Sequence, residues 1–291
     1  MENVIEIQNV SKAFKGFKID NLSLEVKKGF VTGFIGGNGA GKSTTIKMIM
    51  NLLSPDSGDI SLFGMNYLNN SKEIKERIGF VYDDNIFYDG LTLKHINKII
   101  APAYKQWDQK QFMYYTNLFE LPLNKKIKTF SKGMKMKASL AIALSHHAEL
   151  IIMDEPTSGL DPVFRRELLD ILHHIMQDGE RSIFFSTHIT TDLDRIADYI
   201  AFIQDGQHIF TKDIYAIGED YALVKGPLDL LDSDTEREFI SVQKANTGFE
   251  GLTENVNSIR ELFNNEVVIE TPSLEDIMYF MKKGARHAEF I

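Results

Sequence analysis

Cysteine is absent from this chain of 291 residues, and tryptophan occurs only once. Without thiols the chain can form neither a disulfide framework nor a thiolate metal site, so an apolar core must hold the fold, and a chain of this length can bury one. No run approaches the ~18 consecutive apolar residues of a membrane-spanning helix. Basic residues are also in deficit, with 32 Lys and Arg against 41 Asp and Glu, and this balance disfavours nucleic acid as a partner.

Glycine is concentrated in one segment that joins a short apolar stretch to an amphipathic one. Residues 36–43 read Gly-Gly-Asn-Gly-Ala-Gly-Lys-Ser. Residues 31–35 before them have the pattern of a buried strand, and residues 44–53 after them carry apolar residues at helical spacing. Glycines in this position let backbone N–H groups surround phosphates, and the dipole of the following helix favours negative charge. The segment therefore predicts a nucleoside triphosphate site, with ATP or GTP as its ligand.

The expected nucleotide contacts are the members of this glycine-rich loop and the first residues after it: Gly36, Gly37, Asn38, Gly39, Ala40, Gly41, Lys42, Ser43 and Thr44. The Lys42 ammonium would reach the β- and γ-phosphates, and the Ser43 hydroxyl would be a ligand of Mg²⁺. An ordinary glycine-rich turn is the alternative, and the flanking strand and helix patterns argue against it.

A second apolar strand pattern, residues 150–153, ends in two carboxylates, Asp154 and Glu155. Ligands of open parallel sheets gather at the carboxyl ends of the strands, where these side chains would lie. We expect Asp154 to hold Mg²⁺, directly or through water. We expect Glu155 to polarise the attacking water, a general-base role that typically contributes ~10²–10⁴-fold to the rate, with Lys42 as a second catalytic residue. An acidic turn without chemistry is the alternative.

Three shorter motifs accompany these two segments in a fixed order. Phe-Ser-Lys-Gly-Met-Lys at 130–135 precedes the acidic strand, Ser-Gly-Leu-Asp at 158–161 follows it, and Ser-Thr-His at 186–188 ends a further apolar strand. Together with the glycine-rich loop, this series resembles the ATP-binding-cassette (ABC) ATPases over about residues 1–215. The first motif departs from the family pattern at Lys132, where glycine is usual.

The resemblance implies further site residues, because cassettes of this family pair head to tail around two ATP molecules. Ser131 and the N–H of Gly133 would contact the γ-phosphate bound by the partner cassette. Asp161 would cross the dimer to organise the partner's loop. His188 would contact the γ-phosphate of its own subunit and is expected to be catalytic. The same residues also fit structural roles, because Asp161 followed by proline is typical of a helix N-terminus.

Two further assignments depend on positions where the sequence departs from the family. Asp83 or Asp84 stands where a glutamine usually links the metal to the membrane partner, and we expect Asp83 to join Ser43 and Asp154 as a metal ligand. Phe14 is the expected aromatic residue that stacks on adenine, with Phe17 as the rival.

The expected fold class is α/β. Alternating apolar residues before residue 31 predict an antiparallel β subdomain, and strand and helix patterns alternate through the parallel core, with a helical insert at about 86–148. The cassette is expected to span residues 1–215, followed by a small α+β accessory domain at 216–291. In this second domain we expect strands at 221–225, 239–242 and 267–270, helices at 227–231 and 252–263, and a capping box at 273–276.

The resemblance implies the ATP-hydrolysing subunit of a bacterial ABC exporter, with ATP and Mg²⁺ as cofactors. Its partners would be a second ATPase subunit, either a second copy of the chain or a related ATPase, and a separate integral membrane subunit, at the cytoplasmic face of the membrane. The apolar cluster at 86–93 lies where the family receives a helix of that subunit, or it packs the insert onto the core. The overall character is similar to antimicrobial- and toxic-peptide export ATPases. A soluble ABC ATPase of cofactor assembly or DNA repair and a non-catalytic nucleotide switch are the alternatives.

Overall fold

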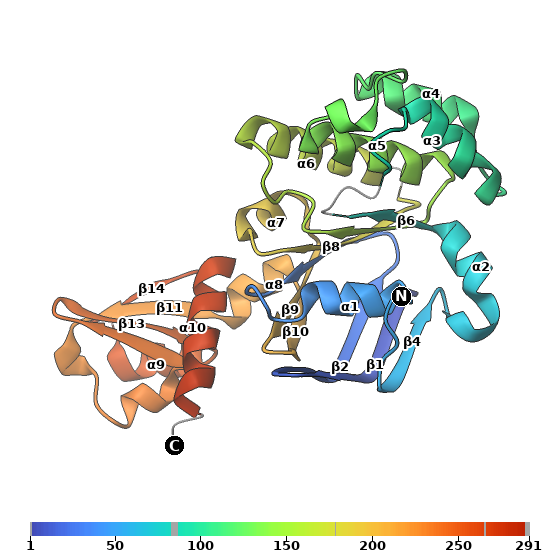
Figure 1. Cartoon of the computed structure of the whole chain (residues 1–291). Helices are drawn as coiled ribbons and strands as arrows, with labels where there is room; N and C mark the ends of the chain where they lie inside the picture. Colours follow the sequence, from blue (N-terminus) through green and yellow to red (C-terminus); the bar gives the residue numbers. More distant parts are fainter. Residues whose placement is uncertain (1, 83–86, 178, 265, 289–291) are drawn as a thin grey trace. The chain divides into compact units, whose positions relative to one another are not determined.

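The computed structural model describes residues 2–82, 87–177, 179–264 and 266–288, without the side chains of the last four (Figure 1). The chain divides into two compact units, residues 1–211 and 212–291. None of the helices in the described ranges has the length and apolarity needed to cross a membrane. Asp83 and Asp84, one of which was expected to bind the metal, lie outside the described residues.

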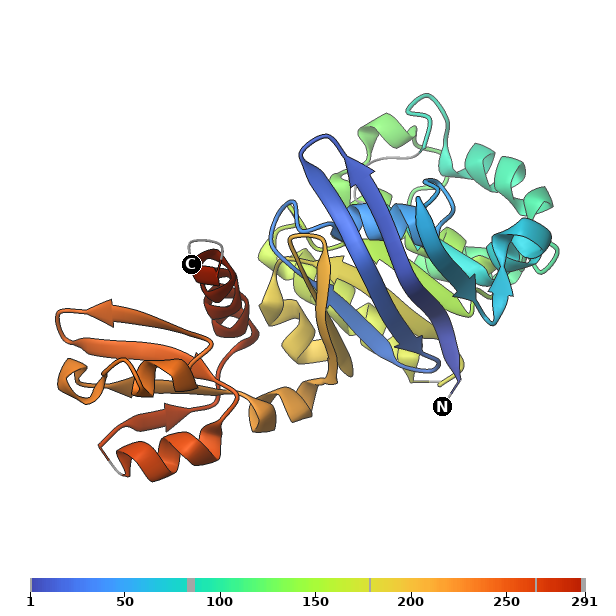
Figure 2. The same ribbon diagram turned by 90° about the horizontal axis from the view of Figure 1, so that it is seen from below.

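The first unit contains an antiparallel sheet of four strands in the order β2-β1-β4-β5. Its strands are β1 (Asn3–Phe14), β2 (Phe17–Lys27), β4 (Ser57–Leu62) and β5 (Met65–Asn66). Figure 2 shows β1 and β2 side by side in dark blue. The alternating apolar residues point into the core, with Ile5 opposite Leu62 and Ile7 opposite Leu24, which confirms the predicted antiparallel β subdomain.

A second sheet of six strands, in the order β10-β9-β3-β8-β7-β6, forms the centre of this unit. Its strands are β3 (Val31–Ile35), β6 (Ile78–Val81), β7 (Leu150–Asp154), β8 (Ser182–Thr187), β9 (Tyr199–Gln204) and β10 (Gln207–Asp213). The neighbouring pairs from β9 to β6 are parallel. Every residue of β3, β7 and β8 is buried, as expected for parallel strands covered on both faces.

The parallel register places the carboxyl ends of three central strands together. Ile35 at the end of β3 pairs with Thr187 at the end of β8, and Asp154 at the end of β7 pairs with Ser186. The segments that leave these strands therefore start from one edge of the sheet. That edge carries the candidate site.

Helices cover the central sheet on both sides (Figure 1). The helix α1 (Lys42–Ile49) lies between the two sheets, where its Ile46 and Ile49 join Leu22 and Phe34 in one apolar core. The remaining helices of the unit are α2 (Tyr67–Arg77), α3 (Leu93–Ile100), α4 (Gln109–Leu118), α5 (Lys132–Ser145), α6 (Pro162–Met176) and α7 (Thr190–Ile196). The group α3, α4 and α5 forms the predicted helical insert, with short 3-10 turns at Ala101–Ala103 and Ile127–Thr129.

The second unit has its own sheet, in the order β12-β13-β11-β14, and an aromatic core of Phe239, Phe249 and Phe263. Its elements are α8 (Ile214–Asp220), β11 (Ala222–Gly226), β12 (Ser241–Ala245), β13 (Gly248–Thr253), α9 (Val256–Phe263), β14 (Val268–Glu270) and α10 (Leu274–Ala288), with 3-10 turns at Leu228–Leu230 and Thr235–Glu238.

Several details of the second unit differ from the sequence expectation and one agrees with it. The strand expected at 239–242 begins at Ser241, and β13 was not expected. The helix expected from residue 252 begins only at Val256, because β13 occupies the preceding residues, and the helix expected at 227–231 is a single 3-10 turn. The capping box before α10 is confirmed: the Ser273 hydroxyl accepts from the N–H of Asp276 at 3.1 Å, and the Asp276 carboxylate accepts from the N–H of Ser273 at 2.9 Å.

Candidate active site

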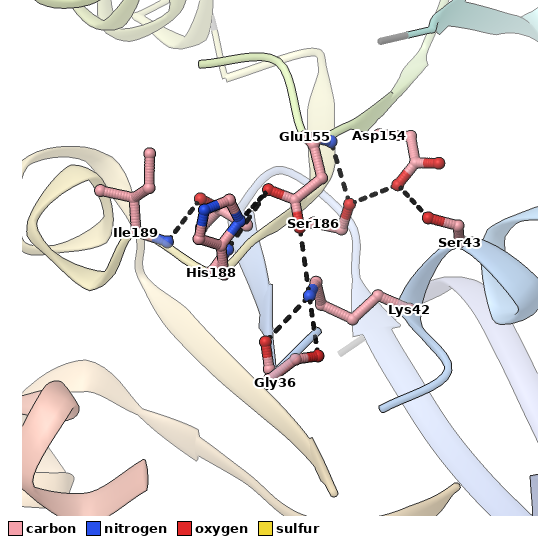
Figure 3. Close-up of polar contacts among 10 residues, drawn as sticks. Gly36, Lys42, Ser43, Asp154, Glu155, Ser186, His188 and Ile189 are labelled. Carbon is pink, nitrogen blue, oxygen red and sulfur yellow. Dashed lines mark hydrogen bonds and ion pairs between the residues drawn. The ribbon is translucent and has the colours of Figure 1, made fainter. Parts of the chain in front are cut away.

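A cavity of about 710 Å³ lies at the carboxyl edge of the central sheet. Residues from the β1–β2 turn, the glycine-rich loop, the segment after β7 and the end of β8 line it: Gly16, Phe17, Gly37, Asn38, Gly39, Gly41, Lys42, Ser43, Thr44, Glu155, Ser158 and His188. Figure 3 shows the polar contacts among the residues of this edge. The loop between β3 and α1, Lys42 and the two residues Glu155 and His188 are thus brought together as predicted.

The glycine-rich loop needs glycine for its backbone path and for space. Gly39 and Gly41 have φ values of +81° and +113°, a region that residues with a Cβ rarely adopt. A Cβ on Gly36 would collide with the carbonyl oxygen of Ile203. The loop therefore turns tightly at the start of α1, and helix N-termini of this kind favour a bound anion.

Lys42 is the first residue of α1 and is 5% exposed. Its ammonium donates to the carbonyl oxygens of Gly36 at 2.8 Å and Gly37 at 3.3 Å, and it lies 3.1 Å from Oε1 of Glu155. The loop carbonyls thus hold the Lys42 charge at the cavity wall. In that position it can exchange the Glu155 carboxylate for a phosphate oxygen.

Asp154, at the end of β7, is 4% exposed and faces the start of α1. Its Oδ1 accepts hydrogen bonds from the hydroxyls of Ser43 at 3.1 Å and Ser186 at 2.7 Å. No group of three His, Asp or Glu side chains that could hold a metal alone occurs in the described ranges. The paired oxygens of Ser43 and Asp154 fit Mg²⁺, which prefers few protein ligands and completes its shell with water and phosphate oxygens.

Glu155 has a strained backbone, with φ at +49°, and contacts hold both its N–H and its two carboxylate oxygens. Its N–H donates to the carbonyl and hydroxyl oxygens of Ser186, both at 3.1 Å. Oε1 faces Lys42, and Oε2 accepts from the backbone N–H of His188 at 3.3 Å and lies 2.8 Å from its Nδ1 (Figure 3). Because Nδ1 donates to this carboxylate, Nε2 is the ring nitrogen that His188 can present to a ligand.

Ser186 was not among the expected site residues, although it lies two residues before His188 in the Ser-Thr-His motif. The structure places its hydroxyl between the two acidic residues, where it donates to Asp154 and accepts from the N–H of Glu155. Ser186 thus links the Asp154 carboxylate to the backbone of Glu155. Its position near the end of a buried strand, within the Ser-Thr-His motif, could have indicated this role from the sequence.

Several predicted residues do not line the cavity of their own chain. Gly36, Ala40 and Asp154 do not line it, although their neighbours in the sequence do. Ser131, Gly133 and Asp161 belong to segments outside it. Ser131 caps α5 by accepting from the N–H three residues on at 3.2 Å. Asp161 caps α6 in the same manner, at 3.0 Å. A Cβ on Gly133 would lie 2.7 Å from the ring of Phe164, so this glycine lets the first turns of α5 and α6 pack closely. Ser131, Gly133 and Asp161 therefore have structural roles in this chain.

The two candidate adenine-stacking residues flank the turn between β1 and β2. Phe14 and Phe17 pair across the hairpin, with ring centroids 6.3 Å apart and an interplanar angle of 25°. Phe17 lines the cavity, whereas Phe14, which is 45% exposed, does not. The geometry therefore favours Phe17, the rival, over Phe14.

A family model described as "ABC transporter" matches residues 19–158. The bacitracin transport ATP-binding protein BcrA of Bacillus licheniformis is 36% identical over 71% of this chain and 69% of that relative. BcrA of Enterococcus faecalis is 30% identical over 97% of this chain and 96% of that relative, so the likeness includes the second unit. The lantibiotic transport ATP-binding protein SrtF of Streptococcus pyogenes is 32% identical over 72% of this chain and 91% of its own.

Solved structures agree with these relatives. The ATP-binding subunit of an ABC transporter superposes with a TM-score of 0.67 at 27% identity, over 74% of this chain and 92% of that chain. An ATP-binding cassette solved as a dimer in a post-hydrolysis state, with ADP and Pi, superposes with a TM-score of 0.64 over 72% of this chain and 98% of its own. At 21% identity this second likeness concerns the fold alone.

Proposed function

This chain belongs to the ATP-binding subunits of ABC transporters, and from that membership we propose that it hydrolyses ATP to drive the export of an antimicrobial or toxic peptide through a separate membrane subunit. The observation that carries the chemistry is the Glu155 carboxylate, which lies between Lys42 and His188 at the cavity wall. The names of two relatives, which refer to the transport of bacitracin and of lantibiotics, support a peptide as cargo.

The contacts of Glu155 suggest how binding prepares hydrolysis. Lys42 exchanges Glu155 for the β- and γ-phosphates, and the freed Oε1 then accepts a proton from the attacking water. His188 retains its contact to Oε2 and presents Nε2 to the γ-phosphate. Ser43 and Asp154, with Asp83 as a further ligand, would hold Mg²⁺, which neutralises phosphate charge when bound.

The same proposal includes a second copy of the chain. Ser131 and Gly133 lie at the N-terminus of the 14-residue helix α5, where backbone N–H groups favour an anion. They do not line their own cavity. A phosphate bound in a partner's cavity is therefore the ligand that they would contact, with Asp161 beside the partner's loop, in a head-to-tail homodimer.

Exposed apolar residues of the helical insert support a membrane partner at the cytoplasmic face. Phe87 and Leu93 are buried, so part of the apolar cluster at 86–93 packs the insert onto the core. Tyr88 of the same cluster is 81% exposed and supports docking of a membrane subunit at this position. We assign no chemistry to residues 216–291, which we propose to stabilise the assembly.

Purification of the tagged chain from its own cells, after detergent extraction of membranes, tests this proposal. We expect a multi-span membrane protein to co-purify and the phosphate release of the complex to rise with an added peptide antibiotic, whereas a matched Lys42→Ala complex stays inactive. Recovery of an active ATPase from the soluble fraction alone, without a membrane chain, would instead favour the soluble ABC ATPases.

A further inference from the structure

The first turn of α6 contacts two other segments of the site. The ring of Phe164 packs on Gly133, at the start of α5. The next residue, Arg165, points to α7: its Nε donates to Oδ1 of Asp192 at 2.5 Å, and its Nη2 donates to the hydroxyl of Thr191 at 2.8 Å. The turn that follows the Asp161 loop is thus joined to the helix that follows His188.

The Arg165–Asp192 ion pair joins two helices at a cost in desolvation free energy, because it buries a carboxylate. Asp192 is 2% exposed, and a carboxylate this deeply buried needs a paired charge, which Arg165 supplies. Within the described ranges Asp192 Oδ2 has no hydrogen-bond partner, so the desolvation of the carboxylate is only partly offset. Buried ion pairs contribute little net free energy of folding compared with apolar packing. A gain in stability therefore does not explain why Arg165 and Asp192 are paired here.

The pair acts on a helix that is fixed to the core. A Cβ on Gly33 in β3 would collide with the side chain of Leu193, so α7 packs directly against the central sheet. Phe164 and Arg165 therefore connect α6 on one side to the start of α5 and on the other side to this fixed helix.

Two contacts join the segments 155–165 and 188–192. His188 Nδ1 lies 2.8 Å from Oε2 of Glu155, and Arg165 donates to Asp192, four residues after His188. The segments 155–165 and 188–192 are thus linked at both ends. A shift of α6 relative to α7 would change the position of His188 relative to Glu155.

We propose that Arg165 is a positioning residue for ATP hydrolysis, which acts through Asp192 to keep His188 on Glu155 and the Asp161 loop in place. This inference rests on the proposed roles of Glu155 and His188. Arg165 contacts Asp192 and Thr191, away from Lys42 and the glycine-rich loop, so ATP binding does not depend on it. Loss of the pair therefore lowers kcat and leaves the affinity for ATP unchanged.

Steady-state phosphate release and equilibrium binding of a fluorescent ATP analogue, measured on the full chain, test the proposal. Arg165→Ala should lower kcat ~10- to 100-fold, since misplacement of catalytic groups by about 1 Å has effects of this size. The Kd for the analogue should stay within about 3-fold of the wild type. Arg166→Ala, at an exposed arginine of the same helix, is the matched control and should change neither quantity. Arg165→Lys should recover part of kcat, because lysine keeps the charge but loses the planar donor pair.

Arg165→Ala leaves a buried, unpaired Asp192 and could unfold the chain, so a second variant keeps the test decisive. The double variant Arg165→Ala with Asp192→Asn removes that charge, and its kcat should be no lower than that of Arg165→Ala. A folded double variant with wild-type kcat, or an equal loss in Arg166→Ala, would overturn the proposal. A wild-type chain that binds ATP but releases no phosphate would contradict the proposed function instead.

Discussion

Glu155 adopts a left-handed backbone conformation that costs a non-glycine residue about 1–3 kcal/mol, and such strain persists only where the surroundings hold it. Here Ser186 holds the backbone, while Lys42 and His188 hold the carboxylate. The strain therefore directs the side chain into the cavity. In the proposed hydrolysis, the chemistry at this scale depends on one carboxylate, Glu155, and on its two neighbours Lys42 and His188.

Glu155→Gln tests that dependence, because glutamine keeps the shape and removes the proton acceptor. Phosphate release should fall by ~10²-fold or more, the size of a general-base contribution, while ATP binding is retained. Glu167→Gln, at an exposed glutamate of α6 that pairs with Lys137, is the matched control and should keep wild-type turnover. Unchanged phosphate release in Glu155→Gln would remove Glu155 from its assigned role.

Local motifs explain how much of the site could be predicted from the sequence. The glycine-rich loop and the two acidic residues are each set by short stretches whose spacing follows from the chemistry, so their strand and helix context was predictable. The choice between Phe14 and Phe17 was not, because the two residues pair across one hairpin turn and only the fold shows which ring reaches the loop. The Arg165–Asp192 pair joins residues 27 positions apart, and no periodicity indicates it.

At the scale of elements, the junction between α5 and β6 depends on His146. Its two ring nitrogens lie 3.1 Å and 3.0 Å from the carbonyl oxygens of Ile142 in α5 and Ile78 in β6. The ring also stacks on that of Tyr104, with the ring centroids 3.9 Å apart. Burial lowers the pKa of His146, although both carbonyl contacts oppose this effect. The buried ring therefore resists protonation more than the same ring in the unfolded chain.

Stability should consequently fall in acid. A lowered folded-state pKa means that the unfolded chain binds a proton first as the pH drops below about 6.5, so the contribution of His146 is complete above that pH and declines below it. The slope is at most about 1.4 kcal/mol per pH unit for one proton. Burial lowers the pKa of His208 too, and that residue adds to the same trend.

Urea unfolding between pH 7.5 and 5.5 measures this slope. His146→Phe, which keeps an aromatic ring against Tyr104, should show a shallower decline than the wild type, whereas His173→Gln at an exposed position of α6 should not. Equal slopes in the wild type and His146→Phe would show that another group causes the acid sensitivity.

Elements differ in how clearly the sequence indicates them. Strands β3, β7 and β8 are buried along their whole length, because both faces of a parallel strand are covered, and each contains an apolar stretch that indicates it in the sequence. The strands expected at 31–35 and 150–153 match β3 and β7 within one residue. Strand β13 was missed, because Gly248 and Gly251 interrupt its alternation; a Cβ on Gly251 would lie 2.6 Å from the ring of Phe239. Packing of an aromatic residue from elsewhere, rather than local propensity, explains that glycine.

At the scale of the whole molecule, each of the two units has its own sheet and core. All residues that line the candidate cavity belong to the first unit. A chain ending at Asp213, which retains β10, should therefore bind ATP within about 3-fold of the full chain but dimerise more weakly. Calorimetry measures the ATP affinity of the truncated chain, and analytical ultracentrifugation measures its dimerisation. Loss of ATP affinity in a truncated chain that is shown to fold would refute the assignment of nucleotide binding to the first unit alone.

We propose that two copies of the chain close on ATP and reopen after hydrolysis by Glu155. Analytical ultracentrifugation of full-length Glu155→Gln with Mg²⁺ tests it most directly, because this variant should bind ATP without consuming it. We predict a dimer with ATP and a monomer with ADP, at concentrations that saturate both nucleotides. If the variant binds ATP and remains monomeric, ATP does not close a dimer of this chain.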